Sequence, residues 1–262
     1  MKQLVVAMIP APGKVVELTD EQYHYLGRVR RVGAGTEIPC VDSSGRRATT
    51  VVVARPGDHR SFALEVVRHG PPAGAADPSG ASIPVTLYVA LLKGKKLDTV
   101  VRQVTELGVD RIVPVITRHC VSRPDPADLQ RKSRRWESIA REATQQSGRP
   151  TIPAVEPAAV LQEVEATEPR GPSAPALSLV FHEAAETVLS IPKTVDSGEP
   201  PREIRVLVGP EGGLAPEELE YLSGIGWHVR RMPVPVVRAE TAAVAAATLV
   251  QSLRSEYTAT AS

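Results

Sequence analysis

The segment Gly209-Pro210-Glu211-Gly212-Gly213 is the part of the chain best suited to hold a ligand. It follows an apolar run at 204–209 that predicts a buried strand, and it precedes 216–224, which predicts a helix with proline in its first turn. Glycines let a ligand approach the backbone and its N–H groups, and open α/β sheets bind ligands at the carboxyl ends of their strands. A tight connection without a ligand is the alternative. No Lys-Ser/Thr pair follows the glycines, and the spacing is not Gly-x-Gly-x-x-Gly, so neither a phosphate loop nor a Rossmann dinucleotide site is indicated.

A second group of reactive side chains, Arg238 and Glu240, comes just before an alanine-rich run at 241–256 that predicts a helix and begins with Thr241. An arginine can stabilise an anion, and a carboxylate can orient it or accept a proton. Glu240 or Thr241 could equally cap the helix, so a charged first turn is the alternative.

A third group, Gln145, Gln146 and Arg149, lies at the end of a predicted helix at 127–148. Glutamine and arginine suit contacts to bases and phosphates. The alternative is an ordinary helix C-terminus, where cations are favourable.

Two kinds of element must position these groups. The first part of the chain looks all-β, and the part after residue 83 alternates strands with helices, which predicts a parallel α/β sheet. A Pro/Gly/Ala-rich stretch at 71–82 predicts a linker between them. The expected strands lie at 36–42, 48–54, 61–67, 83–92, 111–117, 177–182, 204–209 and 227–234, and the expected helices at 95–108, 127–148, 216–224 and 241–256. Residues 184–203 predict a loop.

The chain has 262 residues, and its apolar fraction of 42% is typical of a folded protein. The net charge is only +1, but residues 1–72 hold ten Lys/Arg against seven Asp/Glu and residues 118–149 hold eight against four. Residues 150–204 hold three against nine. Basic zones attract phosphate backbones, and solvated surface is the alternative. Two cysteines without Cys-x-x-Cys spacing indicate neither a disulfide framework nor a metal site, and the absence of a long apolar run favours a cytoplasmic protein outside membranes.

Taken in order, several segments are similar to one family. They are HYLGRVRRVGAGTEI at 24–38, KGKKLDTVVRQVTELGVDRIVPVITRHC at 93–120, EATQQSGR at 142–149, FHE at 181–183, GPEGG at 209–213 and RAETA at 238–242. The chain resembles the RsmE-type 16S ribosomal RNA uridine-N3 methyltransferases of the SPOUT superfamily, from about residue 21 to about residue 253.

The resemblance implies a PUA-like RNA-binding β-barrel at 1–70, a linker at 71–82, and a methyltransferase domain with a deep trefoil knot at 83–262. It also implies S-adenosylmethionine as cofactor, 16S rRNA or the assembled small ribosomal subunit as partner, and a homodimer with the donor site near the subunit interface. The implied donor-binding residues are Phe181, His182, Val208, Gly209, Pro210, Glu211, Gly212, Gly213, Met232, Val234, Val237, Arg238 and Thr241. The expected RNA-binding residues are Arg28, Arg30, Arg31, Arg118, Arg134, Arg135 and Arg149.

The chain departs from the family pattern at two places. A Leu-Gly-x-Arg-hydrophobic-Leu-Arg run is usual before the Glu-Thr pair, and here its glycine and first arginine are replaced by Pro233 and Pro235. Proline has no backbone N–H, so it cannot make any donor contact that this group makes in the family. The family's usual arginine near the N-terminus is also missing.

Methylation at uracil N3 needs a base or a cation, because N3 bears a proton and is a poor nucleophile until the proton leaves. Arg238 is the candidate for stabilising the uracil anion, and Glu240 for orienting Arg238 or accepting the proton. The target base must be unstacked or single-stranded. A ribose 2′-O methyltransferase of the same superfamily and a non-catalytic RNA-binding protein are the competing hypotheses.

Overall fold

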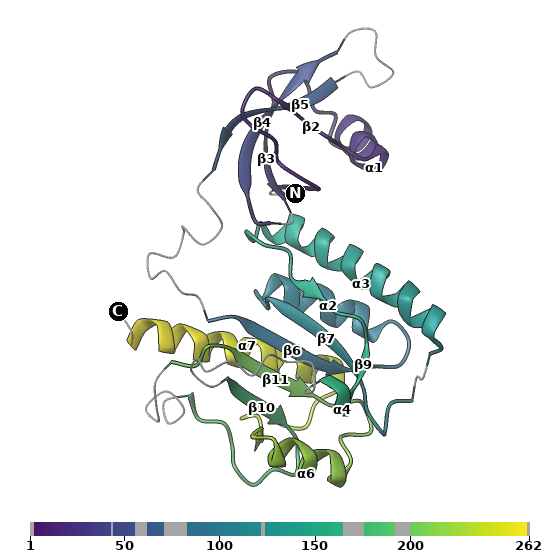
Figure 1. The fold of residues 1–262 in the computed structure, drawn as a ribbon, viewed down its shortest axis with the longest axis vertical. Helices are drawn as coiled ribbons and strands as arrows, with labels where there is room; N and C mark the ends of the chain where they lie inside the picture. The colour runs from purple at the N-terminus through teal and green to yellow at the C-terminus, as the bar shows by residue number, and fades with distance from the viewer. Residues whose placement is uncertain are drawn as a thin grey trace. The chain divides into compact units, whose positions relative to one another are not determined.

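The computed structural model describes residues 3–42, 44–55, 62–70, 83–121, 124–164, 176–191 and 200–260, and Figure 1 draws its fold. The chain divides into two compact units. The first comprises residues 1–80 with 141–152, and the second comprises 81–140 with 153–262. The expected linker at 71–82 lies outside the described residues.

The first unit is built around a five-stranded mixed sheet in the order β1-β3-β4-β5-β2. Its strands are β1 (Leu4–Val6), β2 (Val15–Val16), β3 (Glu37–Asp42), β4 (Arg47–Ala54) and β5 (Phe62–His69). β1 pairs with β3 in parallel and the other pairs are antiparallel. A separate apolar core, which includes Leu4, Leu26 and Leu64, fills this unit.

The expectation of an all-β first part is wrong for residues 20–29, which form the helix α1 (Asp20–His24) and the π-helical turn η1 (Tyr25–Val29). Thr19 caps α1, because its Oγ1 accepts from the Gln22 backbone N–H at 3.2 Å while the Gln22 side chain accepts from the Thr19 N–H at 2.9 Å. Leu26 is fully buried, so the helical segment is held by the core of this unit.

Residues 141–152 pack with the N-terminal strands, although the sequence placed them in the second domain. The side-chain amide of Gln3 donates to the carbonyl oxygen of Thr144 at 3.3 Å and to that of Arg149. Arg47 donates to the carbonyl oxygen of Gly148 at 3.5 Å. These hydrogen bonds satisfy carbonyl groups that a helix C-terminus leaves without internal partners.

The second unit is a parallel sheet in the order β12-β10-β11-β6-β7-β8, with β9 also pairing to β7. Its strands are β6 (Val85–Ala90), β7 (Arg111–Ile116), β8 (Ala154–Val155), β9 (Ala159–Val160), β10 (Leu177–Phe181), β11 (Ile204–Val208) and β12 (His228–Arg230). Its helices are α2 (Lys96–Glu106), α3 (Pro126–Ser147, whose last turns belong to the first unit), α4 (Leu161–Val164), α6 (Pro216–Gly224) and α7 (Ala239–Thr260). The mixed α/β fold agrees with the sequence prediction, and the trefoil knot stays a prediction.

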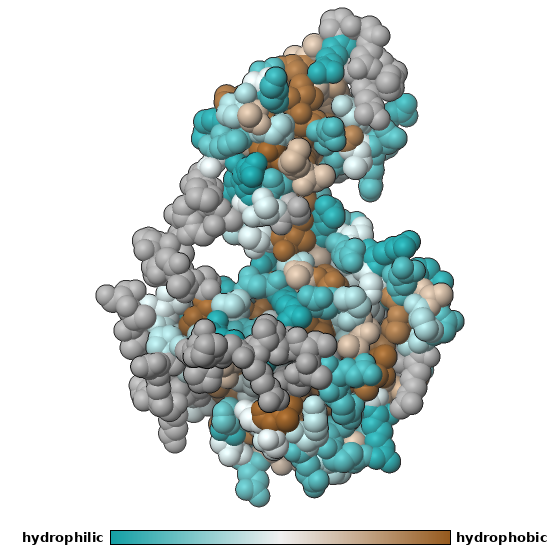
Figure 2. Space-filling view, in the orientation of Figure 1, coloured by the Kyte–Doolittle hydropathy of each residue, from teal (hydrophilic) through white to brown (hydrophobic). Residues whose placement is uncertain are grey.

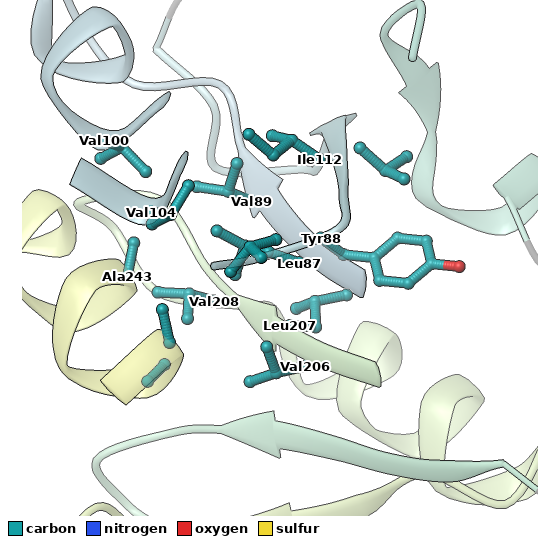
Figure 3. Packing of buried hydrophobic residues seen from close by; sticks show 14 of the residues in the cluster. Leu87, Tyr88, Val89, Val100, Val104, Ile112, Val206, Leu207, Val208 and Ala243 are labelled. Carbon is teal, nitrogen blue, oxygen red and sulfur yellow. The ribbon is translucent and has the colours of Figure 1, made fainter. Parts of the chain in front are cut away.

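Every residue of β6 and β11 is buried, as expected of central strands covered on both faces. α7 packs against β11, β6 and α2. Figure 3 shows Val208 of β11 beside Ala243 of α7, with Val100 and Val104 of α2 nearby. Ala243, Ala246 and Ala247 are fully buried, so the small side chains of α7 let it lie close to the sheet.

On the face shown in Figure 2, hydrophilic residues cover most of the described surface and hydrophobic residues form small, separate patches. Among the described residues, no helix is both long enough and apolar enough to cross a membrane.

Candidate functional site

One cavity of about 540 Å³ lies at the carboxyl edge of the parallel sheet. β12, β10 and β11 are neighbours and run in parallel, so the segments that follow them meet at one edge. The cavity is lined by Lys96, Phe181, His182, Glu183, Val208, Gly209, Pro210, Glu211, Gly213, Leu214, Arg231, Met232, Val234, Pro235, Val236, Val237, Arg238, Ala239 and Ala242. A volume in this range is ordinary for a small-molecule or cofactor site.

The glycine loop 209–213 forms one wall of the cavity. Gly213 has a φ of +70°, a conformation that favours glycine, and its N–H donates to the carbonyl oxygen of Pro210 at 3.0 Å. That N–H therefore closes the turn and is not free for a ligand. A side chain at Gly213 would start 3.7 Å from Nε2 of His182 and 3.6 Å from Oε1 of Glu183, both of which line the cavity.

Gly212 faces away from this wall and is absent from the lining. A Cβ at Gly212 would lie 3.1 Å from the Cβ of His119, in the segment after β7. The ring Nδ1 of His119 lies 3.1 Å from the carbonyl oxygen of Gly212 and 3.3 Å from that of Gly213. His119 therefore supports the loop from behind.

Three charged side chains from distant parts of the sequence meet here, and two of them, Lys96 and Glu211, line the cavity. Nζ of Lys96, at the start of α2, lies 2.9 Å from Oε1 of Glu211 and 3.3 Å from Oε2 of Glu240. The hydrogen bond to Glu211 holds the pKa of the Lys96 ammonium above its ordinary value. Burial opposes ionisation of Glu211, but hydrogen bonds from Lys96 and from backbone N–H groups hold the pKa of its carboxyl below the ordinary value.

The ring of His182 is oriented by a hydrogen bond from the backbone, which leaves its Nε2 available to the cavity. Its Nδ1 accepts a hydrogen bond from the Ala184 N–H at 3.2 Å, so the neutral ring carries its proton on Nε2. Nε2 lies 4.0 Å from Oε2 of Glu183. The segment after β10 therefore supplies both a donor and a carboxylate to the cavity.

The segment 232–238 forms the opposite wall. Pro233 and Pro235 are both exposed, Pro235 lines the cavity, and Val236 is 82% exposed. Arg238 is exposed beside the cavity. Its side chain makes no ion pair within the described part of the chain, and Glu240 pairs with Lys96 instead of orienting Arg238.

α7 begins at Ala239, so Glu240 and Thr241 lie inside its first turn and do not precede it. Thr241 is exposed and lies outside the cavity lining. All other residues expected to bind the donor, apart from Gly212, line the cavity.

The arginines expected to bind RNA lie in both units. Arg28, Arg30 and Arg31 are exposed at and just after η1, and Arg149, in the same unit, is half-buried. In the second unit, the Arg118 N–H donates to Oε1 of Glu218 at 2.8 Å, and its guanidinium pairs with Glu217.

Arg134 and Arg135 are neighbours on α3 with different surroundings. Arg134 is exposed, whereas Arg135 binds Oδ2 of the buried Asp98 on α2 through Nε at 2.9 Å and Nη2 at 2.7 Å. Nε1 of Trp136 donates to the other oxygen of Asp98 at 3.2 Å. Arg135 therefore holds two helices together, and this pairing explains its charge without RNA.

Eight residues that line the cavity are absent from the expected donor-binding residues: Lys96, Glu183, Leu214, Arg231, Pro235, Val236, Ala239 and Ala242. Glu183 lies two residues after β10, and Arg231 directly follows β12, so the rule that parallel strands end at one edge could have found them. No local signal identifies Lys96, because its partner Glu211 is 115 positions away.

The cavity fits a molecule such as S-adenosylmethionine. Val208, Leu214, Met232 and Val237 provide apolar walls for a ring system, and the carboxylate of Glu183 is complementary to positive charge.

Two family models match the chain and indicate its class. The family model described as an RNA methyltransferase domain matches residues 79–251, and the one described as an RNA methyltransferase PUA domain matches residues 18–61. The fold and site are therefore those of an RNA methyltransferase with an attached PUA domain.

Relatives then specify the family. The chain is 30% identical to the ribosomal RNA small subunit methyltransferase E of Mycobacterium bovis over 260 residues, which cover 98% of this chain and 94% of the relative. It is also 30% identical to the enzyme of the same name from Synechocystis, over 94% of this chain and 77% of the relative. The solved structure of ribosomal RNA small subunit methyltransferase E from Neisseria gonorrhoeae, bound to S-adenosyl methionine, superposes with a TM-score of 0.79 at 25% identity, covering 97% of this chain and 98% of the other. The chain belongs to the ribosomal RNA small subunit methyltransferase E family, which confirms the resemblance found in its sequence.

Proposed function

We propose that this protein transfers a methyl group from S-adenosylmethionine to N3 of a uridine in 16S ribosomal RNA. The observation that carries the proposal is the cavity at the ends of three parallel strands, β10, β11 and β12. The family to which the chain belongs supports the same proposal. The related Neisseria protein binds S-adenosyl methionine. The proposed RNA substrate would place the enzyme in the cytoplasm, where ribosomes are assembled.

The donor residues in this proposal are those expected residues that line the cavity. Their apolar members hold the ring system, and the Nε2–H of His182 and the carboxylate of Glu183 are available to polar groups of the ligand. S-adenosylmethionine supplies an activated methyl group on a sulfonium. Pro235 lies in the lining and has no backbone N–H, so this residue cannot donate a backbone hydrogen bond to the ligand.

Arg238 is the proposed catalytic residue. It is a cation at the cavity without a carboxylate partner in the described residues, so it is free to stabilise the negative charge that develops on uracil when N3 loses its proton. Glu240 is engaged with Lys96, so its proposed part is positional, and the N3 proton passes to solvent water at the exposed edge of the cavity beside Arg238.

RNA binding is proposed for the exposed arginines of both units, Arg28, Arg30, Arg31 and Arg134, with Arg118 and Arg149 as further contacts. Residues 1–70 would form the PUA-like domain and residues 83–262 the methyltransferase domain, joined by 71–82. A homodimer is proposed as well, supported by the exposed apolar side chains of Val234 and Val236 beside the cavity. Sedimentation should show twice the 28.0 kDa chain mass, and a monomer at micromolar concentration would contradict it.

The test is methylation of small ribosomal subunits, and separately of naked 16S rRNA, from a strain that lacks the corresponding enzyme. After digestion to nucleosides, mass spectrometry should find 3-methyluridine only when S-adenosylmethionine and the protein are both present. A 2′-O-methylated nucleoside would instead support the ribose enzyme. Tight RNA binding without any methylated product would support a non-catalytic protein.

A further inference from the structure

Lys96 connects two walls of the cavity that are far apart in the sequence. Its ammonium lies 2.9 Å from Oε1 of Glu211 in the glycine loop and 3.3 Å from Oε2 of Glu240 in the first turn of α7. The backbone N–H of Lys93 also donates to the same Glu211 oxygen at 3.3 Å. The start of α2 is thereby attached to the glycine loop by two hydrogen bonds and to α7 by an ion pair.

The geometry makes Lys96 necessary for the two carboxylates to coexist. Because both oxygens contact one nitrogen, at 2.9 and 3.3 Å, they can be no more than about 6.2 Å apart. Two carboxylates at such a distance repel each other unless a cation lies between them. Oε2 of Glu240 is buried and has no hydrogen-bond partner of proper geometry among the described residues, so the ammonium provides its compensation.

We propose that Lys96 is a positioning residue for methyl transfer, which fixes the separation between the glycine loop and the Arg238 end of α7. Glu211 lies in the wall that contains Gly209 and Gly213, and Glu240 lies two residues after Arg238. Removal of the ammonium would let both walls move apart under the repulsion of the carboxylates. This inference rests on the proposed function, because it assigns to the two walls the donor and the catalytic arginine.

The first experiment measures the affinity of the full chain for S-adenosylmethionine by calorimetry. Lys96→Met keeps most of the aliphatic side chain and removes the charge, so it should weaken binding by roughly tenfold. Lys95→Met is the matched control. It removes the same charge from the preceding residue, which is exposed, and it should bind S-adenosylmethionine as the wild type does.

The second experiment tests the bridge by rescue. In Lys96→Met, neutralising one carboxylate with Glu240→Gln removes the repulsion, so the double variant should bind more tightly than Lys96→Met alone. Glu240→Gln in the presence of Lys96 should weaken binding by a smaller factor than Lys96→Met, because the ion pair with Glu211 persists. This non-additivity distinguishes a charge bridge from a lysine that only fills space.

The wild type and the four variants also give a readout that needs no ligand. The melting temperature should fall in Lys96→Met, recover in part in the double variant, and stay unchanged in Lys95→Met. Wild-type affinity in Lys96→Met, or a double variant no better than Lys96→Met in both affinity and melting temperature, would overturn the inference. Wild-type protein that binds no S-adenosylmethionine contradicts the proposed function, and the melting temperatures then decide on the bridge alone.

Discussion

At Gly212, the absence of a side chain lets the glycine loop lie close to His119. The sequence suggested that a side chain there would occupy the approach of a ligand, but the Cβ position faces His119 at 3.1 Å and not the cavity. Such a contact is tighter than most Cβ contacts, so either the loop or His119 must shift by a few tenths of an ångström if a side chain is added. Gly212 therefore matters more for the position of the glycine loop than for the approach of a ligand to the cavity.

Gly212→Val should weaken S-adenosylmethionine binding because the loop moves off His119. Calorimetry is the measurement, and roughly tenfold or more is expected. Gly224→Val is a suitable control, since nothing lies within 4 Å of its Cβ position. Equal affinities for wild type and Gly212→Val would show that the loop adapts without cost to the site.

Arg238→Ala should lower the rate of methylation by roughly 100-fold, because the cation that stabilises the uracil anion is removed. Single-turnover kinetics with saturating S-adenosylmethionine isolate this effect from donor binding. Arg231→Ala, a change of the same type at another cavity arginine, is the comparison. A rate reduced equally in both variants would mean that Arg238 contributes only general positive charge.

At the level of elements, Asp98 joins α2 to α3 through Arg135 and Trp136. Asp98→Ala should lower the free energy of unfolding by about 1–3 kcal/mol, because the buried indole N–H of Trp136 is left without an acceptor. Chemical denaturation provides the measurement. Glu106→Ala, at an exposed position on the same helix, should change stability little, and equal losses in the two variants would refute the role of Asp98.

Elements with strong periodicity or continuous apolar runs could be predicted from the sequence. β6, β11 and α2 appear within the predicted segments, because burial on two faces or on one helical face leaves a local pattern. α1 was missed, although Thr19 and Gln22 have capping-box spacing, because five residues without a buried side chain give too little periodicity.

The site could be predicted only in part, for a similar reason. The glycine loop and the segment before α7 are local patterns, whereas the roles of Lys96 and Arg135 depend on partners that folding brings from distant positions. A charge in a sequence does not reveal whether its partner is a phosphate or a carboxylate. Arg135 was therefore assigned to RNA when the fold gives it Asp98.

For the whole molecule, RNA affinity should fall steeply with salt, because neutralised phosphates release counterions. Replacing Arg28, Arg30 and Arg31 together by Ala should lower the slope of log affinity against log salt by roughly 0.7–0.9 for each phosphate that is no longer neutralised. Affinity for S-adenosylmethionine should not change, since the cavity lies within the second unit.

Arg134→Glu provides the corresponding test on α3, and Arg135 is left intact because its removal would disturb the helix pair. Filter binding over a range of salt concentrations gives the slopes. A triple variant with the wild-type slope and wild-type methylation would show that these arginines are only solvated surface.

The hydrogen bonds from Gln3 to the carbonyl groups of Thr144 and Arg149 set an order of events during protein synthesis. The nascent chain emerges from its amino end, so the first unit cannot complete these bonds until residue 149 has left the ribosome. At translation rates of about 5–20 residues per second, this delay lasts roughly 7–30 s. During that interval β1 lacks the contacts that Gln3 makes at its start, and most of the parallel sheet of the second unit has yet to be translated.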